Sequence, residues 1–126
     1  LRGQELRPSD LEVRMMNGPS ELLRQLDRAV EELRGYGAQR IIVFGSVARG
    51  DADEYSDLDL IVIKPTTMGF VERLGDVVRR CPSAQGANVI VYTPEEIQRM
   101  QEAGNPFLKH ALSEGKVVYE KAAAGS

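Results

Sequence analysis

The chain has 126 residues, 42% of them apolar, and its 16 basic and 19 acidic residues give a net charge of −3. This length suits one domain with a single core. No apolar run is long enough to cross a membrane. No cluster of Lys and Arg favours broad electrostatic binding to nucleic acid. The single Cys81 cannot form an internal disulfide and no leader segment is visible, so we expect a cytoplasmic protein.

The N-terminal part of the chain mixes charge with scattered apolar residues and shows no clear pattern, so residues 1–17 are taken as an extension. Its apolar side chains could dock on the domain or on a partner: Leu6, Leu11, Val13, Met15 and Met16. We expect one domain over residues 18–121 and a flexible tail over 122–126. At the start of the domain, Ser20 is expected to cap a helix that ends near Gly35 and Gly37.

A strand and a turn follow this helix. The run Arg40–Phe44 is rich in β-branched and aromatic side chains and predicts a buried strand that ends at Gly45. Gly45 has no side chain, so a phosphate can approach its backbone. Ser46 is expected to cap a short helix over Val47–Arg49, whose first N–H groups favour an anion, and Arg49 adds a guanidinium suited to phosphate oxygens. The turn therefore predicts a nucleotide-binding site at Gly45, Ser46 and Arg49.

Two carboxylates, Asp57 and Asp59, lie at the start of a second apolar run, Leu58–Ile63. On a strand they would project from the same face, about 7 Å apart at about 3.3 Å per residue. Two acids on one face of an apolar strand repel each other and resist burial unless a cation lies between them. Oxygen ligands of this kind favour Mg²⁺, which proteins hold through one or two carboxylates together with substrate phosphates. Asp57 and Asp59 are therefore the predicted metal ligands.

The remaining elements alternate between helix and strand. Apolar residues from Phe70 to Val78 recur at helical spacing and predict a crossover helix that ends at Cys81 and Pro82. A strand over Ala87–Tyr92 follows, then a helix with a capping box, a short helix and a closing strand: Thr93 to Met100, Phe107–Leu112 and Lys116–Tyr119. These elements indicate a small α/β (α+β) domain.

Two other motifs can be tested on the same residues. Gly45 and Gly50 match the outer glycines of a P-loop, but Asp51 and Ala52 stand where that motif needs Lys and Ser or Thr. A calcium loop starting at Asp51 also fails, because it has neither the glycine of the sharp turn nor the bidentate glutamate at its end.

The segment from Gly45 to Leu60 resembles the active-site signature of the DNA polymerase β-like nucleotidyltransferase superfamily, and it is most similar to the minimal nucleotidyltransferases. Their pattern Gly-Ser-x-Ala-Arg-Gly, a polar stretch and Ser-Asp-Leu-Asp-Leu is matched here. The resemblance implies a mixed β-sheet flanked by helices, Mg²⁺ held by Asp57 and Asp59, and a triphosphate bound near Gly45. Many relatives carry a second arginine where Val47 stands.

The resemblance also implies a third carboxylate from a later strand, and Asn88 stands where that aspartate is expected. An amide oxygen can coordinate a cation, but it brings no negative charge and cannot act as a general base. The predicted catalytic residues are therefore Asp57, Asp59 and Asn88, and the change at Asn88 leaves two interpretations open. It is either a tolerated ligand change or the mark of a degenerate enzyme.

On this basis we expect a protein that binds Mg²⁺ and a nucleoside triphosphate, ATP by preference, and transfers a nucleotidyl group to a hydroxyl of a protein or small molecule. The resemblance implies pairing with a helical HEPN-domain protein in a toxin–antitoxin module, and a homo-oligomer is the other expected assembly. A catalytically degenerate module that neutralises a partner by contact alone is the alternative. Nucleotidylation of an antibiotic is a weaker third hypothesis, since such relatives carry a second domain to hold the drug.

Overall fold

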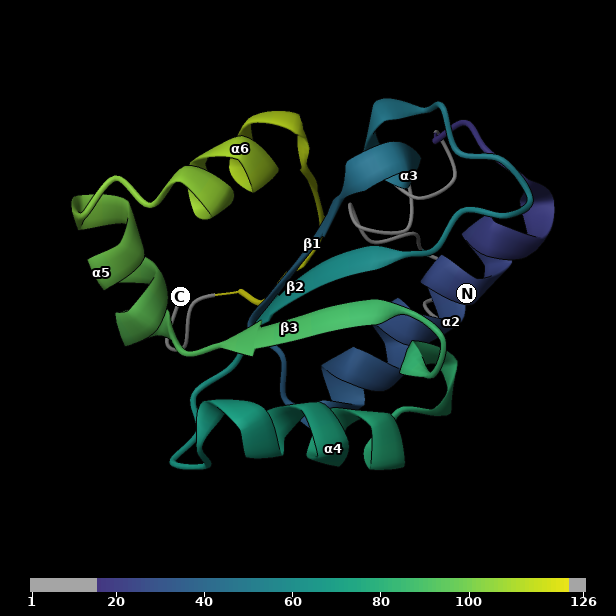
Figure 1. Cartoon of the computed structure of the whole chain (residues 1–126). Helices are drawn as coiled ribbons and strands as arrows, with labels where there is room; N and C mark the ends of the chain where they lie inside the picture. The colour runs from purple at the N-terminus through teal and green to yellow at the C-terminus, as the bar shows by residue number, and fades with distance from the viewer. Residues whose placement is uncertain (1–15, 123–126) are drawn as a thin grey trace.

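A four-stranded mixed sheet forms the centre of the protein in a computed structural model, which describes residues 16–122 (Figure 1). The strand order is β3-β2-β1-β4. Strand β1 (Arg40–Phe44) pairs antiparallel with β2 (Asp59–Ile63) and with β4 (Lys116–Glu120), whereas β2 pairs parallel with β3 (Asn88–Tyr92). The predicted α/β class, with a mixed sheet flanked by helices, is confirmed.

Residues 1–15 and 123–126 lie outside the described part of the chain, and with them the predictions about Leu6, Leu11, Val13, Met15 and most of the tail. Met16 is described and is buried in the main core.

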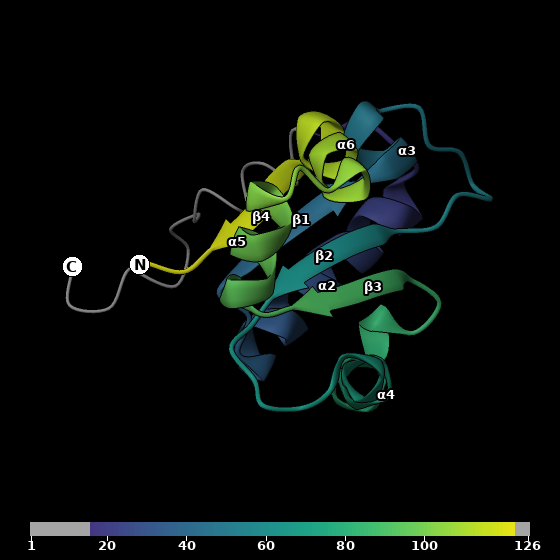
Figure 2. The same cartoon turned by 60° about the vertical axis from the view of Figure 1, so that its left-hand side comes forward.

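Alternating side chains of the strands supply two cores, one on each face of the sheet, as a period of two requires. Leu60 and Val62 of β2 face the main core, while Ile61 and Ile63 face the second core. Helices α2 (Ser20–Tyr36) and α4 (Phe70–Arg80) contribute to the main core. Helices α5 (Pro94–Glu102) and α6 (Pro106–Glu114) cover the second, and Figure 2 shows them across the sheet from α2.

The helix ends agree in part with the predicted caps. The capping box of Thr93 and Glu96 is confirmed at the start of α5. Asn105 caps α6 by accepting a hydrogen bond from the Leu108 N–H at 3.0 Å. The predicted cap at Ser20 is wrong, because Pro19 holds the N-cap position of α2 and Ser20 is already helical. That helix ends on Gly37 in the left-handed region, at φ 113°.

Helix α4 presents a different face to the protein from the one its apolar spacing predicts. Val77 is fully buried, but Val71 is 76% exposed and three more apolar side chains are exposed with it, namely Phe70, Leu74 and Val78. Arg73 and Asp76 are buried in their place. The helix is therefore rotated so that two charged residues face inward.

Specific partners explain this rotation, since a charge is buried only when it is paired and hydrogen-bonded. Arg73 donates to the carbonyl oxygens of Met68 at 2.8 Å and Val91 at 3.0 Å, and to the Glu96 carboxylate at 2.7 Å. Asp76 accepts a 2.6 Å hydrogen bond from the Tyr36 hydroxyl, which lowers the pKa of Asp76, while burial and this bond raise the pKa of Tyr36 to about 12. These bonds anchor α4 to α2, β3 and α5.

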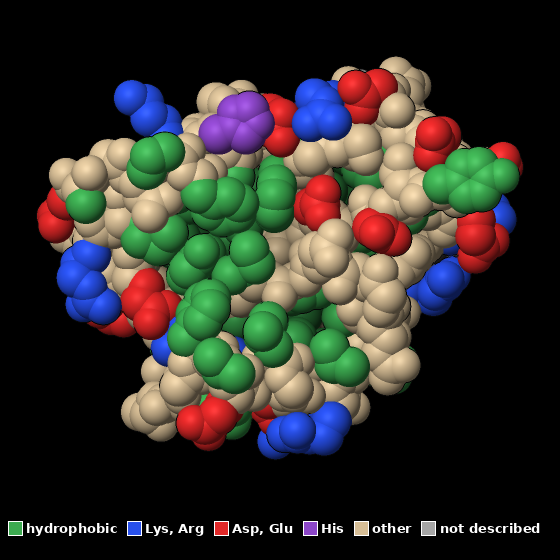
Figure 3. Space-filling model, in the orientation of Figure 1, with side chains coloured by type: hydrophobic (Ala, Val, Ile, Leu, Met, Phe, Trp, Pro, Cys, Tyr) green, Lys and Arg blue, Asp and Glu red, His purple; other side chains and the backbone are tan. Residues whose placement is uncertain are grey.

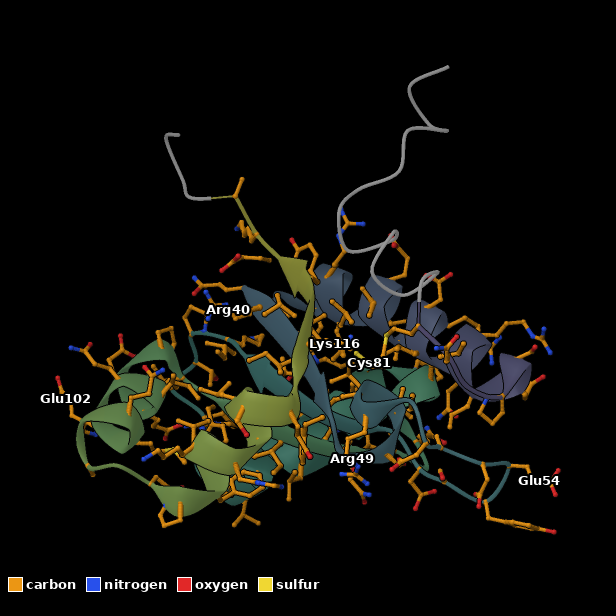
Figure 4. The ribbon with its side chains drawn as sticks, turned by 90° about the horizontal axis from the view of Figure 1, so that it is seen from above. Arg40, Arg49, Glu54, Cys81, Glu102 and Lys116 are labelled. Atoms are coloured by element: carbon orange, nitrogen blue, oxygen red, sulfur yellow. The ribbon has the colours of Figure 1, made fainter. Side chains whose placement is uncertain are left out.

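The short turn η2 (Pro82–Ala84) follows α4, and Cys81 lies between them, buried inside the protein (Figure 4). Burial raises the pKa of its thiol to about 11, so the thiol remains protonated at neutral pH.

In residues 16–122, no helix combines the length and the apolar character needed to span a bilayer.

The rotation of α4 predicts unequal costs for two alanine substitutions. Val77→Ala should lower the free energy of unfolding by about 2 kcal/mol, because two buried carbons are lost from the core. Leu74→Ala, at an exposed position, should cost less than about 1 kcal/mol although it removes more carbon. Urea denaturation of the two variants measures both, and a larger loss for Leu74→Ala would contradict the observed orientation.

The Arg73–Glu96 pair predicts a loss of stability in acid. The hydrogen bond from Arg73 lowers the pKa of Glu96, so the pair stabilises the fold fully above the ordinary carboxyl pKa near 4.5 and progressively less as the pH falls through the lowered value. Glu96→Gln should lower the free energy of unfolding by about 2 kcal/mol at pH 7 and flatten its decline below pH 4.5. Glu95→Gln, an exposed change on the same helical turn, is the control. Parallel pH profiles for the two variants would exclude this role of Glu96.

Candidate active site

The candidate site forms where β1 meets the first residue of α3 (Gly45–Arg49) beside the start of β2. The antiparallel register sets Phe44 opposite Asp59. Gly45 has a left-handed φ of 74°, and a Cβ on it would overlap the Oδ2 atom of Asp59. Only glycine combines this backbone angle with this close approach, so the Asp59 carboxylate lies directly against the turn.

Asp57 lies outside the strand that was predicted to hold it. Strand β2 begins at Asp59, and Asp57 is an exposed residue at the end of the loop before it. Leu58, between the two carboxylates, is fully buried in the main core, and its carbonyl oxygen accepts the Asn88 N–H at 2.8 Å. The buried Leu58 thus anchors the backbone between the two aspartates.

Asn88 is next to Asp59, where the predicted third ligand should be. The parallel register pairs the two residues, and the Asn88 Nδ2 atom donates to Asp59 Oδ1 at 2.8 Å. Within residues 16–122, no group of three or more His, Cys, Asp or Glu side chains is placed to hold a metal ion. The structure therefore brings one predicted ligand carboxylate, that of Asp59, together with the Asn88 amide, while Asp57 precedes Asp59 by two residues in the chain.

The loop between α3 and β2 carries further acids, and the carboxylate of one of them is engaged in hydrogen bonds within the loop. Asp53 accepts hydrogen bonds from the Tyr55 N–H at 2.9 Å and from the Ser56 hydroxyl at 3.2 Å, which closes a local turn. Glu54 lies at the far end of this loop, away from Arg49 (Figure 4). Asp53 and Glu54 are thus separate from the candidate site.

Helix α3 corrects one prediction and explains one departure from the family pattern. It begins at Gly45 with Phe44 at its N-cap position and no side-chain cap, so the predicted capping by Ser46 is wrong. Ser46 is a half-buried residue of the first turn, and its carbonyl oxygen accepts the N–H groups of Gly50 and Asp51. Val47 is buried in the main core, so a long cationic side chain there would displace core packing.

A carboxylate that sequence reasoning missed, Glu114, closes the site from the end of α6. It accepts the Gly45 N–H at 3.0 Å and the Arg49 Nη1–H at 3.1 Å, and its side chain is only 15% exposed. The Arg49 hydrogen bond lowers the pKa of Glu114, and the bonds of Arg49 to Glu114 and then to Asp51 raise the pKa of Arg49. No local signal marks Glu114, because its partners are 65 and 69 residues away in the sequence.

His110, one turn before Glu114, is exposed, with Nε2 at 3.6 Å from the glutamate Oε2. Through this contact with Glu114, His110 lies at the edge of the candidate site.

The apolar surface near the site extends across several elements. Figure 3 shows apolar side chains gathered between α6 and α4 on the face that Figure 1 presents, with acidic side chains at their margin. In this region Phe44 packs edge-on against Phe107 with ring centroids 5.7 Å apart, and Phe70 packs against Tyr92 at 5.6 Å. The polar groups of the site therefore adjoin an apolar surface.

Comparisons with known proteins identify the family and the fold. Residues 23–118 match the family model of the nucleotidyltransferase domain. A Methanocaldococcus jannaschii protein whose name describes a protein adenylyltransferase is 35% identical over 85 residues, which cover 64% of this chain and 58% of that protein. The chain thus spans less than two thirds of this relative's length.

Solved structures share the fold. A crystal structure from Sulfolobus solfataricus, described as a nucleotidyltransferase, is 25% identical with a TM-score of 0.51 and covers 77% of this chain and 85% of its own. A toxin–antitoxin crystal structure with AMP-PNP is 21% identical with a TM-score of 0.53. The match covers 75% of this chain and 73% of the chain in that structure. The family match extends over most of the chain, from α2 to β4, and the chain therefore belongs to the nucleotidyltransferase domain family.

Proposed function

We propose that this protein binds a nucleoside triphosphate, ATP by preference, with Mg²⁺ and transfers the nucleotidyl group to a hydroxyl of a partner protein or small molecule. One observation carries the proposal: the Gly45 N–H, the Arg49 guanidinium and the Asp59 carboxylate converge on one turn between β1 and β2. The turn thus presents phosphate donors beside a metal ligand. In this assignment Gly45, Ser46 and Arg49 bind the β- and γ-phosphates.

The oxygen ligands of the candidate site fit Mg²⁺ bound together with a nucleotide. It demands oxygen ligands and is usually held by one or two carboxylates with substrate phosphates rather than by a complete protein cage. Asp57 and Asp59 would hold it, and the Asn88 amide bond to Asp59 fixes the orientation of that carboxylate. When bound, the ion would neutralise phosphate charge and polarise the attacking oxygen.

The proposed reaction is an in-line displacement at the α-phosphorus. The acceptor oxygen forms a bond to that phosphorus, the bond to the bridging oxygen breaks, and pyrophosphate leaves. Arg49 stabilises the charge that develops on the pyrophosphate, so positioning and electrostatics supply most of the rate. The hydroxyl proton passes to water or to a base of the acceptor, because the amide of Asn88 cannot accept it.

A protein acceptor is the form of the proposal that the comparisons favour. One relative is named as a protein adenylyltransferase, and one structure with this fold is a toxin–antitoxin complex with AMP-PNP. Together with the resemblance to minimal nucleotidyltransferases, these names support a HEPN-domain partner that this protein neutralises. The apolar surface beside the site offers room for such a partner.

A second function, neutralisation of a partner by contact alone, is supported by two residues. Asn88 removes a negative charge from the site, and Val47 is buried where many relatives carry an arginine. Such a module would keep the fold and the interaction surface without the chemistry.

The proposed metal and nucleotide site predicts calorimetric binding of MgATP to the wild type. Asp59→Ala should weaken that binding about tenfold or more, which corresponds to about 1.4 kcal/mol, because it removes a metal ligand. Asp57→Ala should act in the same direction. Asp27→Ala, an exposed change on α2, is the control and should leave the dissociation constant unchanged. Equal affinities in all four proteins would remove the proposed site.

The amide at position 88 predicts a gain of activity on conversion to a carboxylate. With labelled ATP and the protein encoded by the neighbouring gene as acceptor, Asn88→Asp should transfer label about 100-fold faster than the wild type, since it restores a general base. Asn88→Ala is the matched control and should transfer no faster than the wild type. An inactive wild type with an active Asn88→Asp would favour the contact-only function, and a slower Asn88→Asp would refute the assignment of Asn88.

A further inference from the structure

The Glu114 carboxylate occupies the two donors that the proposed function assigns to phosphate. Its Oε1 atom takes the Gly45 N–H at 3.0 Å and its Oε2 atom takes the Arg49 Nη1–H at 3.1 Å. A phosphate group would present two oxygens to the same pair of donors. We propose that Glu114 is an internal competitor for the phosphate-binding position, which a polyphosphate must displace, and this inference rests on the proposed function.

The fixed position of α6 makes displacement a movement of the side chain alone. Asn105 caps the start of this helix, and Leu108 and Ala111 anchor it in the second core. At its end, a Cβ on Gly115 would overlap the Ala111 carbonyl oxygen and the Ile42 side chain, so the backbone packs tightly against β1. Helix α6 therefore stays in place while the Glu114 carboxylate rotates away from Gly45.

The flexibility of the glutamate side chain suits this role, and His110 offers a second position. The three side-chain torsions of Glu114 allow its carboxylate to leave the Gly45 N–H without any backbone change. His110 Nε2 is already 3.6 Å from Oε2, on the exposed side of α6. The carboxylate can thus exchange the donors of α3 for this imidazole and for water.

Charge decides which ligands can displace the carboxylate. Any incoming phosphate meets a like charge at the same donors, and this repulsion lowers its affinity. Phosphate or pyrophosphate without a metal ion can interact only with the Gly45 N–H and the Arg49 guanidinium. A metal-bound triphosphate gains Asp57 and Asp59 through the metal as well, so it overcomes the competition. Glu114 therefore makes the site selective for ligands that use both the phosphate donors and the metal ligands.

The experiment compares wild type, Glu114→Gln and Glu120→Gln in calorimetric titrations with MgATP and, separately, with metal-free inorganic pyrophosphate. Glu120 pairs with Arg40 at the other end of β1, so its change removes the same charge outside the site. Glu114→Gln should bind pyrophosphate about three- to tenfold more tightly than Glu120→Gln does, because the like charge is gone. The Glu114→Gln change should also reduce the ratio of the pyrophosphate dissociation constant to the MgATP dissociation constant.

The outcomes separate this inference from the proposed function. If the wild type binds MgATP and the two variants bind pyrophosphate equally, the competitor role is overturned and the nucleotide site stands. If MgATP binds to none of the proteins while pyrophosphate binds more tightly to Glu114→Gln, the competition between Glu114 and phosphate is supported and the proposed nucleotide function is overturned. If no protein binds either ligand, both are overturned.

A measurement on the wild type covers the case in which Glu114→Gln does not fold. The ¹³C resonance of the Glu114 side-chain carboxyl, followed by NMR, should move when pyrophosphate is added in excess, together with the amide resonance of Gly45. A Gly45 amide that responds while the Glu114 carboxyl does not would overturn displacement.

Discussion

The contact between the Gly45 backbone and the Asp59 carboxylate is the constraint on which the rest of the site depends. The left-handed turn at Gly45 places α3 at the end of β1, and the antiparallel register brings Asp59 against it. The proposed phosphate donors and the proposed metal ligand thereby become neighbours although a loop separates them in the sequence. Strand β3 then adds Asn88, and α6 adds Glu114.

Local patterns predicted most of the sheet, and local patterns together with the family resemblance supplied the candidate site residues except Glu114. Short apolar runs identify the strands. The parallel register of β2 and β3 sets Asn88, which the resemblance implied as a third ligand, beside Asp59. The orientation of α4 could not be predicted from apolar spacing, because Arg73 and Asp76 are buried through partners on other elements. Glu114 escaped detection for the same reason: long-range pairings of side chains leave no local pattern.

The two departures from the family pattern have opposite electrostatic effects. Relative to the arginine and the carboxylate that the resemblance implies, the buried Val47 removes a positive charge and the amide of Asn88 removes a negative one. The two changes leave the sum of charges around the turn the same, and each would weaken one proposed interaction, the first with phosphate and the second with a metal ion. Glu114 then adds a negative charge at the proposed phosphate donors, where Arg49 balances it.

The candidate site is assembled from residues between positions 45 and 114, contributed by α3, the loop before β2, β2, β3 and α6. A ligand that contacts all of these elements would bind the native state in preference to the unfolded chain, in which they are apart. By mass action, a ligand at 100 times its dissociation constant adds about 2.7 kcal/mol to the free energy of unfolding. Proteases that cleave the unfolded chain would then act more slowly when the ligand is abundant, so the lifetime of the protein would follow the supply of its own ligand.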